Sequence, residues 1–291
     1  AEREIGRRLR DVRGLEVLDG GGVVMGLAVG DVVVETPTGG RKTFNVGTTP
    51  VVLSPFAAPA GEGVLKFYRG SVLASCPGSG KSPRASLIGS VGGQIARVDL
   101  ALQPNDLKES SALTAMCGLD NGRVCWLSGE GELCIARVEG VVGEEVERLK
   151  VPGRLKNLTR LGTYLAGTVT DSDVTTFKVI KGTEVVWTSK PVNSDRIVSS
   201  LSACPSPPGS DKPCLATATV NFEEAADAAS GDGRVRAELN VLELVDERLR
   251  GVGGLSFVGG AFCMVQVGSV LVVGADEEVL IVRWLEPGER R

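Results

Sequence analysis

The stretch that decides the fold runs from Leu113 to Val138 and reads LTAMCGLDNGRVCWLSGEGELCIARV. It begins with small and apolar residues, turns at Asp120-Asn121-Gly122, and continues with a run that carries Trp126. A second turn, at Gly129-Glu130-Gly131, leads into a third apolar run. Asn-Gly pairs between apolar runs favour tight hairpin turns, because both central residues of such turns need positive φ. The stretch therefore predicts three consecutive antiparallel strands.

Parts of this arrangement return twice further along the chain. Thr175–Lys190 has Gly182 at a turn and a tryptophan on the strand that follows, and Val270–Leu285 ends in a run that carries the third tryptophan. From residue 15 onward, short runs rich in Val, Leu, Ile and Thr alternate with Gly, Pro, Asp, Asn and Ser. The 39 glycines are spread along the whole chain, which indicates many turns. We count about two dozen short strands, spaced by ~8–12 residues.

So many short strands in 291 residues favour a β-propeller, in which radially packed blades leave only short, protected edges. At ~40–50 residues per blade, this length predicts an all-β propeller of six or seven four-stranded blades. The rhythm of the three tryptophan-bearing units resembles the WD-repeat superfamily, and the resemblance implies the same fold. The Gly-His and Trp-Asp dipeptides of strict WD repeats are absent from this chain. Two stacked β-domains are the competing interpretation.

The chain is divided into an N-terminal arm or short helix, residues 1–14, and a single propeller domain, residues 15–291. Ile5, Leu9 and Val12 have the spacing of one helix face. The arm carries five arginines, and we assign Arg7, Arg8 and Arg10 to partner binding, with a solvated helix as the alternative interpretation. Gly143–Leu149 and Glu223–Ser230 also have helical character.

Composition excludes several classes of function. With 42% hydrophobic and 23% charged residues, the chain is globular, and its net charge of −4 argues against a nucleic-acid binder. The uncharged apolar runs are shorter than the ~20 residues that a membrane helix needs. The absence of histidine removes the Ser-His-Asp triad, imidazole acid–base chemistry and His-ligated zinc. We predict no cofactor and no metal, and interpret Thr170–Asp173 as a polar turn.

The cysteine pattern predicts the compartment. Most of the seven cysteines lie inside apolar runs and no CxxC pair occurs, so we expect buried thiols in a reducing compartment, the cytoplasm or nucleus. Cys204 and Cys214 flank a Pro-rich loop, Ser202–Lys212, and a disulfide between them is the alternative.

The loop Ser75–Ser82, SCPGSGKS, has the end of a phosphate-binding motif without its first glycine, and Pro83 disfavours the helix that such a loop must open. The longer stretch SCPGSGKSPRASLI is similar to the Gly-rich loop and strand in the first blade of the endoplasmic-reticulum exchange-factor propeller. Members of that family activate the small GTPase that starts COPII coat assembly. The resemblance implies that Lys81 and its loop would contact a GTPase, although the asparagine that the family carries near the end of this loop is missing here.

The sequence thus predicts a non-catalytic propeller that serves as an interaction scaffold or adaptor subunit of a larger multiprotein assembly. We expect protein partners rather than nucleic acid, and assign no catalytic residue. The predicted partner-binding residues are Lys81, Arg84, Arg7, Arg8 and Arg10. The first alternative is an exchange factor for a small GTPase in vesicle trafficking. The second is an enzyme with a carboxylate-lined central channel, which predicts a strongly shifted pKa among those carboxylates.

Overall fold

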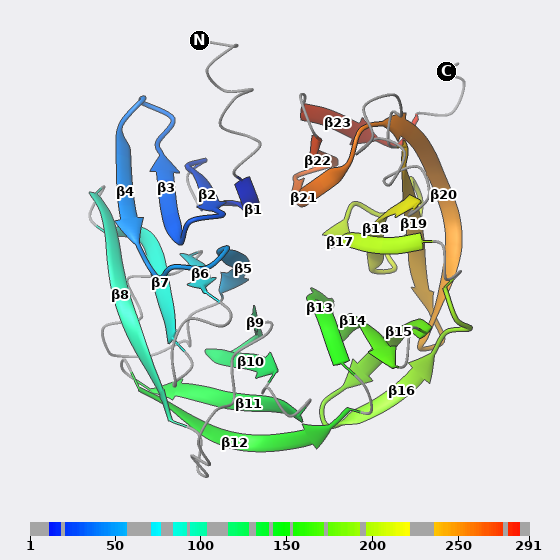
Figure 1. Ribbon diagram of the computed structural model, residues 1–291, viewed down its shortest axis with the longest axis horizontal. Coiled ribbons are helices and arrows are strands. Elements are labelled where there is room, and N and C mark those ends of the chain that lie inside the picture. The colour runs from blue at the N-terminus through cyan, green and yellow to red at the C-terminus, as the bar shows by residue number, and fades with distance from the viewer. Residues whose placement is uncertain are drawn as a thin grey trace. The chain divides into compact units, whose positions relative to one another are not determined.

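The computed structural model describes residues 12–18, 21–56, 71–76, 84–91, 94–103, 116–127, 132–139, 142–151, 154–171, 174–192, 196–221, 236–275 and 279–285. These residues form 23 strands, β1 to β23, and no helix (Figure 1). The described chain divides into two compact units, and the division falls within β13, between Leu158 and Thr159. Each unit is described separately below.

The first unit contains three sets of four consecutive antiparallel strands, which we call blades 1 to 3. Blade 1 is β1 (Val12–Val17), β2 (Val23–Leu27), β3 (Asp31–Glu35) and β4 (Arg41–Asn45). Blade 2 is β5 (Val52–Phe56), β6 (Ser71–Ser75), β7 (Arg84–Val91) and β8 (Gln94–Gln103). Blade 3 is β9 (Met116–Gly118), β10 (Arg123–Leu127), β11 (Glu132–Glu139) and β12 (Val142–Lys150). Short parallel pairing between β8 and β12 joins blades 2 and 3 into one eight-stranded sheet.

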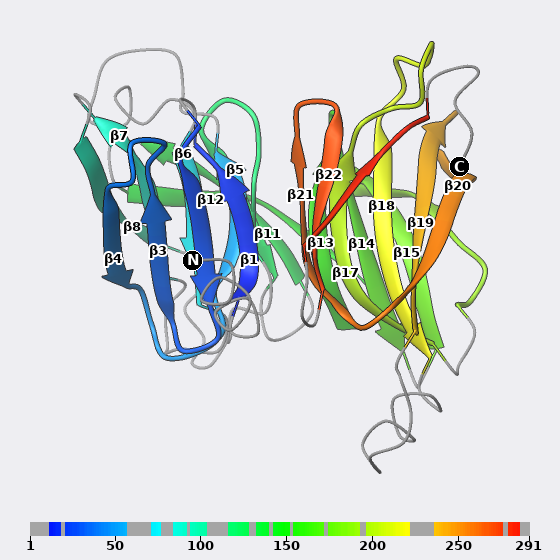
Figure 2. The ribbon, with the colours of Figure 1, turned by 90° about the horizontal axis from the view of Figure 1, so that it is seen from above.

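The second unit contains blades 4 to 6, each of which is a separate antiparallel sheet (Figure 2). Blade 4 is β13 (Arg154–Leu161), β14 (Tyr164–Asp171), β15 (Val174–Lys181) and β16 (Glu184–Thr188). Blade 5 is β17 (Arg196–Cys204), β18 (Cys214–Asn221), β19 (Arg236–Val245) and β20 (Arg248–Val258). Blade 6 is β21 (Ala261–Val267), β22 (Val270–Ala275) and β23 (Val279–Arg283). Within the described residues, blade 6 therefore has three strands where each other blade has four.

The hairpins predicted from the tryptophan-bearing units are confirmed. Asn121 and Gly122 have φ values of 60° and 69°, as the turn between β9 and β10 requires. Gly182, with φ of 57°, turns the chain from β15 into β16, and β22 is followed by β23 as expected.

The predicted helical character of Gly143–Leu149 is wrong, because these residues belong to β12 and pair with β11. Charged side chains of β12 form ion pairs with other strands of the same blade. Arg148 lies 3.0 Å from Glu132 of β11, and Glu147 lies 4.0 Å from Arg123 of β10. The last residues of the predicted N-terminal arm, from Val12 to Gly14, belong to β1. Residues 1–11 and Glu223–Ser230 lie outside the described residues, so a helix there stays a prediction.

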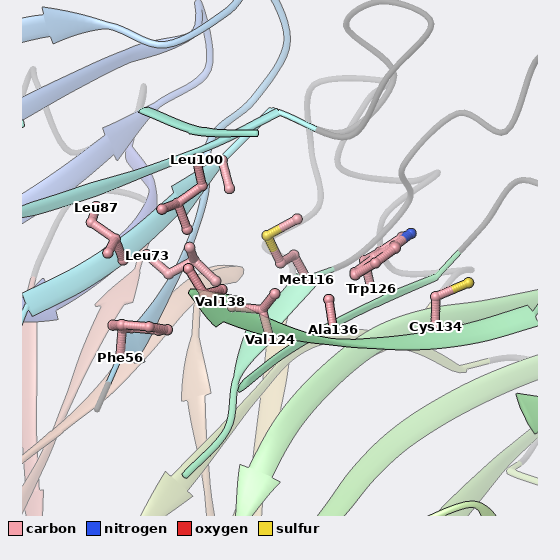
Figure 3. Close-up of a cluster of buried hydrophobic side chains, with 11 residues drawn as sticks. Phe56, Leu73, Leu87, Leu100, Met116, Val124, Trp126, Cys134, Ala136 and Val138 are labelled. Atoms are coloured by element: carbon pink, nitrogen blue, oxygen red, sulfur yellow. The ribbon is translucent and has the colours of Figure 1, made fainter. Parts of the chain in front are cut away.

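The blades are held together by aliphatic side chains. Middle strands are buried on both faces, and Val32, Val33 and Val34 of β3 are each at most 2% exposed. Burying one such side chain stabilises the fold by about 1.5–3 kcal/mol. Figure 3 shows the core cluster between blades 2 and 3, where Trp126 of β10 and Phe56 of β5 are the largest side chains.

The prediction of buried thiols is confirmed, because all seven cysteine side chains are buried. Cys204 and Cys214 lie opposite each other in the register of β17 and β18, and both are thiols, so the alternative of a disulfide between them does not hold.

Candidate functional site

An apolar groove lies between the outer strand of blade 5, β20, and the β22–β23 part of blade 6. Its volume is about 510 Å³, within the ~300–1,000 Å³ that is usual for ligand pockets. Its floor is made by buried residues of blades 5 and 6, namely Cys204, Leu239, Val241 and Leu271. Its walls are formed mainly by Val252, Leu255, Val282, Trp284 and Leu285. The whole groove belongs to the second unit.

The β20 wall is shaped by a bulge. Val241 of β19 pairs with Gly253, and the next residue, Leu242, pairs with Gly251, so that Val252 is the extra residue. Bulges re-aim side chains and bend a strand. Val252 and Leu255 stay 39% and 37% exposed while both line the groove.

Trp284, just beyond the end of β23, forms a fixed aromatic part of the opposite wall. Its indole Nε1 donates a hydrogen bond of 2.8 Å to the carbonyl oxygen of Pro205. The ring also lies against Gly253: a Cβ atom at that position would come within 3.1 Å of both Cη2 and Cζ3 of the ring. A glycine in β20 therefore gives the tryptophan the space for this close approach.

One cationic side chain, the exposed Arg283, lines the groove. A second arginine, Arg250, is exposed on β20, two residues before Val252. Arg250 lies opposite Glu243 in the strand register, and the Glu243 carboxylate accepts a hydrogen bond of 2.5 Å from the Ser210 hydroxyl.

The groove is suited to binding. Its titratable floor residue is Cys204, and burial together with the neighbouring Cys214 raises the pKa of this thiol to about 12. A thiol that stays protonated at neutral pH is a poor nucleophile and a poor metal ligand. In the part of the chain that the structure describes, no cluster of three or more His, Cys, Asp or Glu side chains is arranged to hold a metal ion.

The predicted partner-binding residues fall elsewhere. Arg84 is the first residue of β7, opposite Ala101 of β8, and nothing is described of its side chain. Lys81, Arg7, Arg8 and Arg10 lie outside the described residues, so their roles stay predictions. Sequence reasoning missed the groove, although two signals were present: Trp284 at the end of an apolar run, and the Pro-rich loop whose Pro205 accepts the Trp284 hydrogen bond.

The enzyme alternative predicted a carboxylate with a shifted pKa, and Glu16 of β1 has one. Burial, reinforced by the nearby Cys117 thiol, raises the pKa of Glu16 to about 8. The Ser54 hydroxyl lies 3.5 Å from the Cys117 sulfur and accepts a hydrogen bond of 2.9 Å from the Gly118 amide. The paired carboxylates that glycoside hydrolysis uses are not seen at this place.

Among the described residues, no helix is long and apolar enough to span a membrane.

The overall structure resembles solved propellers. The β-propeller domain of Cps50 (Swd1) from Myceliophteria thermophila aligns over 94% of this chain and 98% of its own, with a TM-score of 0.51 and 14% sequence identity. The predicted β-propeller is thereby confirmed as the fold, with six blades. No protein-family model and no curated protein matches the sequence.

Proposed function

We propose that this propeller is a non-catalytic interaction subunit that holds another protein chain in the groove between β20 and β23. The observation that carries the proposal is the pair of exposed apolar walls, with Val252 and Leu255 on one side and Leu285, 42% exposed, on the other. Single exposed apolar side chains are ordinary, whereas a contiguous apolar recess with a polar rim is typical of a binding site.

The construction of the groove supports protein binding. Trp284 is held by its hydrogen bond to Pro205 and by its close fit on Gly253. A rigid aromatic side chain loses little conformational entropy on binding, and tryptophan and arginine are the commonest energetic anchors of protein interfaces. Trp284 and Arg283 are adjacent in this wall.

We also propose that the protein works in the cytoplasm or nucleus, as one member of a larger assembly. Seven buried thiols support a reducing compartment, because paired cysteines in an oxidising one tend to form disulfides. The likeness to other propellers supports a rigid scaffold, and the assembly itself is the proposal.

Photocrosslinking from inside the groove tests this function. The protein is produced in its own cells with p-benzoylphenylalanine in place of Leu255. The matched control carries the same group in place of Val174, a residue of similar exposure, 44%, on β15. We expect one protein to be captured from position 255 and not from position 174, and to be lost when Trp284→Ala is added. Equal capture at both positions, or none at position 255, contradicts the proposal.

A further inference from the structure

We propose that Asn121 is a site of spontaneous covalent modification, where isoaspartate forms and the inner hairpin of blade 3 loses its register. The inference concerns the turn between β9 and β10, so it is independent of the groove and of the proposed function. Asn121-Gly122 is the one Asn-Gly pair in the sequence. The modification needs water and no other reagent.

The reaction takes place between the two residues of this pair. The backbone nitrogen of Gly122 loses its proton, attacks the side-chain Cγ of Asn121 and expels the amide nitrogen as ammonia, which closes a five-membered succinimide ring. Water then opens the ring at one of its two carbonyl carbons. One opening gives aspartate, and the other gives isoaspartate, in which the main chain passes through the side-chain methylene group. Gly122 favours the attack, because it has no side chain to obstruct its nitrogen.

The first argument is the freedom of the Asn121 side chain. It is exposed, and within the described residues its amide forms no hydrogen bond. Asn45, at the end of β4, is also exposed, but its Nδ2 donates hydrogen bonds of 2.8 Å to the Asp31 carboxylate and of 3.1 Å to the Gly47 carbonyl oxygen. Both bonds must break before the Asn45 side chain can turn toward the next backbone nitrogen. Asn121 has no such restraint.

The second argument is the weak closure of the turn. The Arg123 amide donates a hydrogen bond of 3.4 Å to the Asp120 carbonyl oxygen, longer than the ~2.9–3.0 Å that is usual for such bonds. The Gly122 carbonyl oxygen accepts a bond of 2.9 Å from the Val138 amide, whereas the Gly122 N–H has no acceptor among the described residues. The nitrogen that must attack Asn121 is therefore not held by a hydrogen bond of its own.

The third argument concerns the effect of the product on blade 3. Isoaspartate adds one carbon atom, about 1.5 Å, to the main chain of the turn. β9 has little room to slide, because a Cβ atom at Gly118 would come within 2.1 Å of the Pro55 carbonyl oxygen of β5. The added length therefore acts on the β9–β10 register, which places Met116 opposite Trp126 in the core cluster between blades 2 and 3 (Figure 3).

Incubation of the folded full chain in a mildly alkaline buffer tests the modification. The tryptic peptide 109–123 contains Asn121 as its single amide side chain, so a mass gain in this peptide reports the loss of the amide. Labelling by a protein-isoaspartate methyltransferase then reports the isoaspartate share. We expect conversion at Asn121 to be at least about tenfold faster than at Asn45, whose two hydrogen bonds must break first.

Two controls decide whether the folded turn permits the reaction. Asn121→Gly keeps the positive φ of the turn without a carboxamide, so it should abolish the labelling of this peptide. The same incubation is repeated with the chain unfolded in urea. Conversion of Asn121 in the unfolded chain alone would show that the turn protects it, and equal conversion of Asn121 and Asn45 in the folded chain would remove the argument from side-chain freedom. Either result overturns the proposal.

A matched variant separates the effect of charge from that of the lengthened main chain. Asn121→Asp carries the same charge as isoaspartate on an ordinary main chain, and aspartate tolerates positive φ, so its unfolding equilibrium constant should change less than about threefold. The isoaspartate form, separated by chromatography, should unfold with a constant raised about tenfold or more. Urea denaturation measures both. Equal stability of the two forms would show that the hairpin keeps its register, and the proposed consequence would be wrong.

Discussion

One strand, β20, contributes to two blade boundaries, that between blades 4 and 5 and that between blades 5 and 6. Its leucine at the first boundary is buried, and its leucine at the second is partly exposed. At the first boundary, Leu249 of β20 is 9% exposed and packs in a cluster with Phe177 and Trp187 of blade 4. At the second, Leu255 of the same strand is 37% exposed and lines the groove. At the first boundary, the fourth strand of blade 5 covers the apolar side chains of blade 4. At the second boundary, the described residues of blade 6 include three strands and no fourth. Apolar surface is thus packed at one boundary and partly exposed at the other.

The largest expected difference is between two leucines of β20. Leu249→Ala removes a buried side chain from a packed cluster and should lower the free energy of unfolding by about 2–4 kcal/mol. Leu255→Ala, at the groove, should lower it by less than about 1 kcal/mol. Urea denaturation of the two variants measures the difference. Equal losses would mean that the two boundaries are packed alike, and the comparison would fail.

Trp284→Ala probes the wall of the groove. The loss of a partly buried ring and of its hydrogen bond to Pro205 should cost about 1–3 kcal/mol of folding stability. The same change should abolish capture from position 255. Trp284→Phe keeps most of the apolar contact, so it should recover part of the binding while the Pro205 hydrogen bond stays absent. Full capture by the alanine variant would show that Trp284 is no part of the binding surface.

Two glycines of β20 offer a matched pair. A methyl group at Gly253 would press on the Trp284 ring at 3.1 Å, whereas a methyl group at Gly251 has no heavy atom within 4 Å. Gly253→Ala should therefore push the Trp284 ring away from its preferred rotamer. We expect this displacement to weaken partner binding about threefold to tenfold. Gly251→Ala should leave binding unchanged. An affinity ranking in the opposite order would contradict the close fit of Trp284 on Gly253.

The smallest effect concerns an ion pair at the closed boundary. Glu247, in the turn between β19 and β20, lies 2.9 Å from Lys181 of β15 and accepts a hydrogen bond from Tyr164. Hydrogen bonding to Lys181 lowers the pKa of Glu247, and Glu247 raises the pKa of Lys181. The pair's contribution is therefore complete between the ordinary pKa values of a glutamate and a lysine. It is lost as the pH falls through the lowered pKa of Glu247 or rises through the raised pKa of Lys181.

Glu247→Gln should flatten this pH dependence in thermal unfolding curves recorded from acid to alkaline pH. The change should be small, because both groups are exposed and screened by solvent. It should also fade in high salt. A large loss of stability that persists in high salt would show that Glu247 has a packing role at this boundary.

The fold was largely predictable, because hairpin chemistry is local. Asn121-Gly122 and Gly182 mark turns by their need for positive φ, and the strands around them follow from runs of aliphatic residues. β12 was harder to predict from sequence, because its run of Glu, Arg and Lys also suits a helix. In the structure, pairing with β11 favours the strand, because it places Arg148 beside Glu132. These two residues are 16 positions apart in the sequence, so a local pattern does not reveal the contact.

The groove was not predictable from sequence. Only the end of β20, from Leu255 to Val258, has the pattern of a strand; the preceding Arg-Gly-Val-Gly-Gly looks like a turn. The glycines are tolerated because β19 supplies the pairing and because Trp284 occupies the space beside Gly253. That relation joins residues about 30 positions apart, and only the folded arrangement of blades 5 and 6 brings them together. The predicted basic contacts, Lys81 and the arginines of residues 1–10, remain predictions.

Photocrosslinking from the groove tests the central claim most directly. With p-benzoylphenylalanine in place of Leu255, which lines the groove and is 37% exposed, we predict capture of one protein, and loss of that capture when Trp284→Ala is added. The same group in place of Val174, which is 44% exposed on β15, should not capture that protein. Equal capture from both positions, or none from position 255, would contradict the account that the groove between β20 and β23 holds a partner chain.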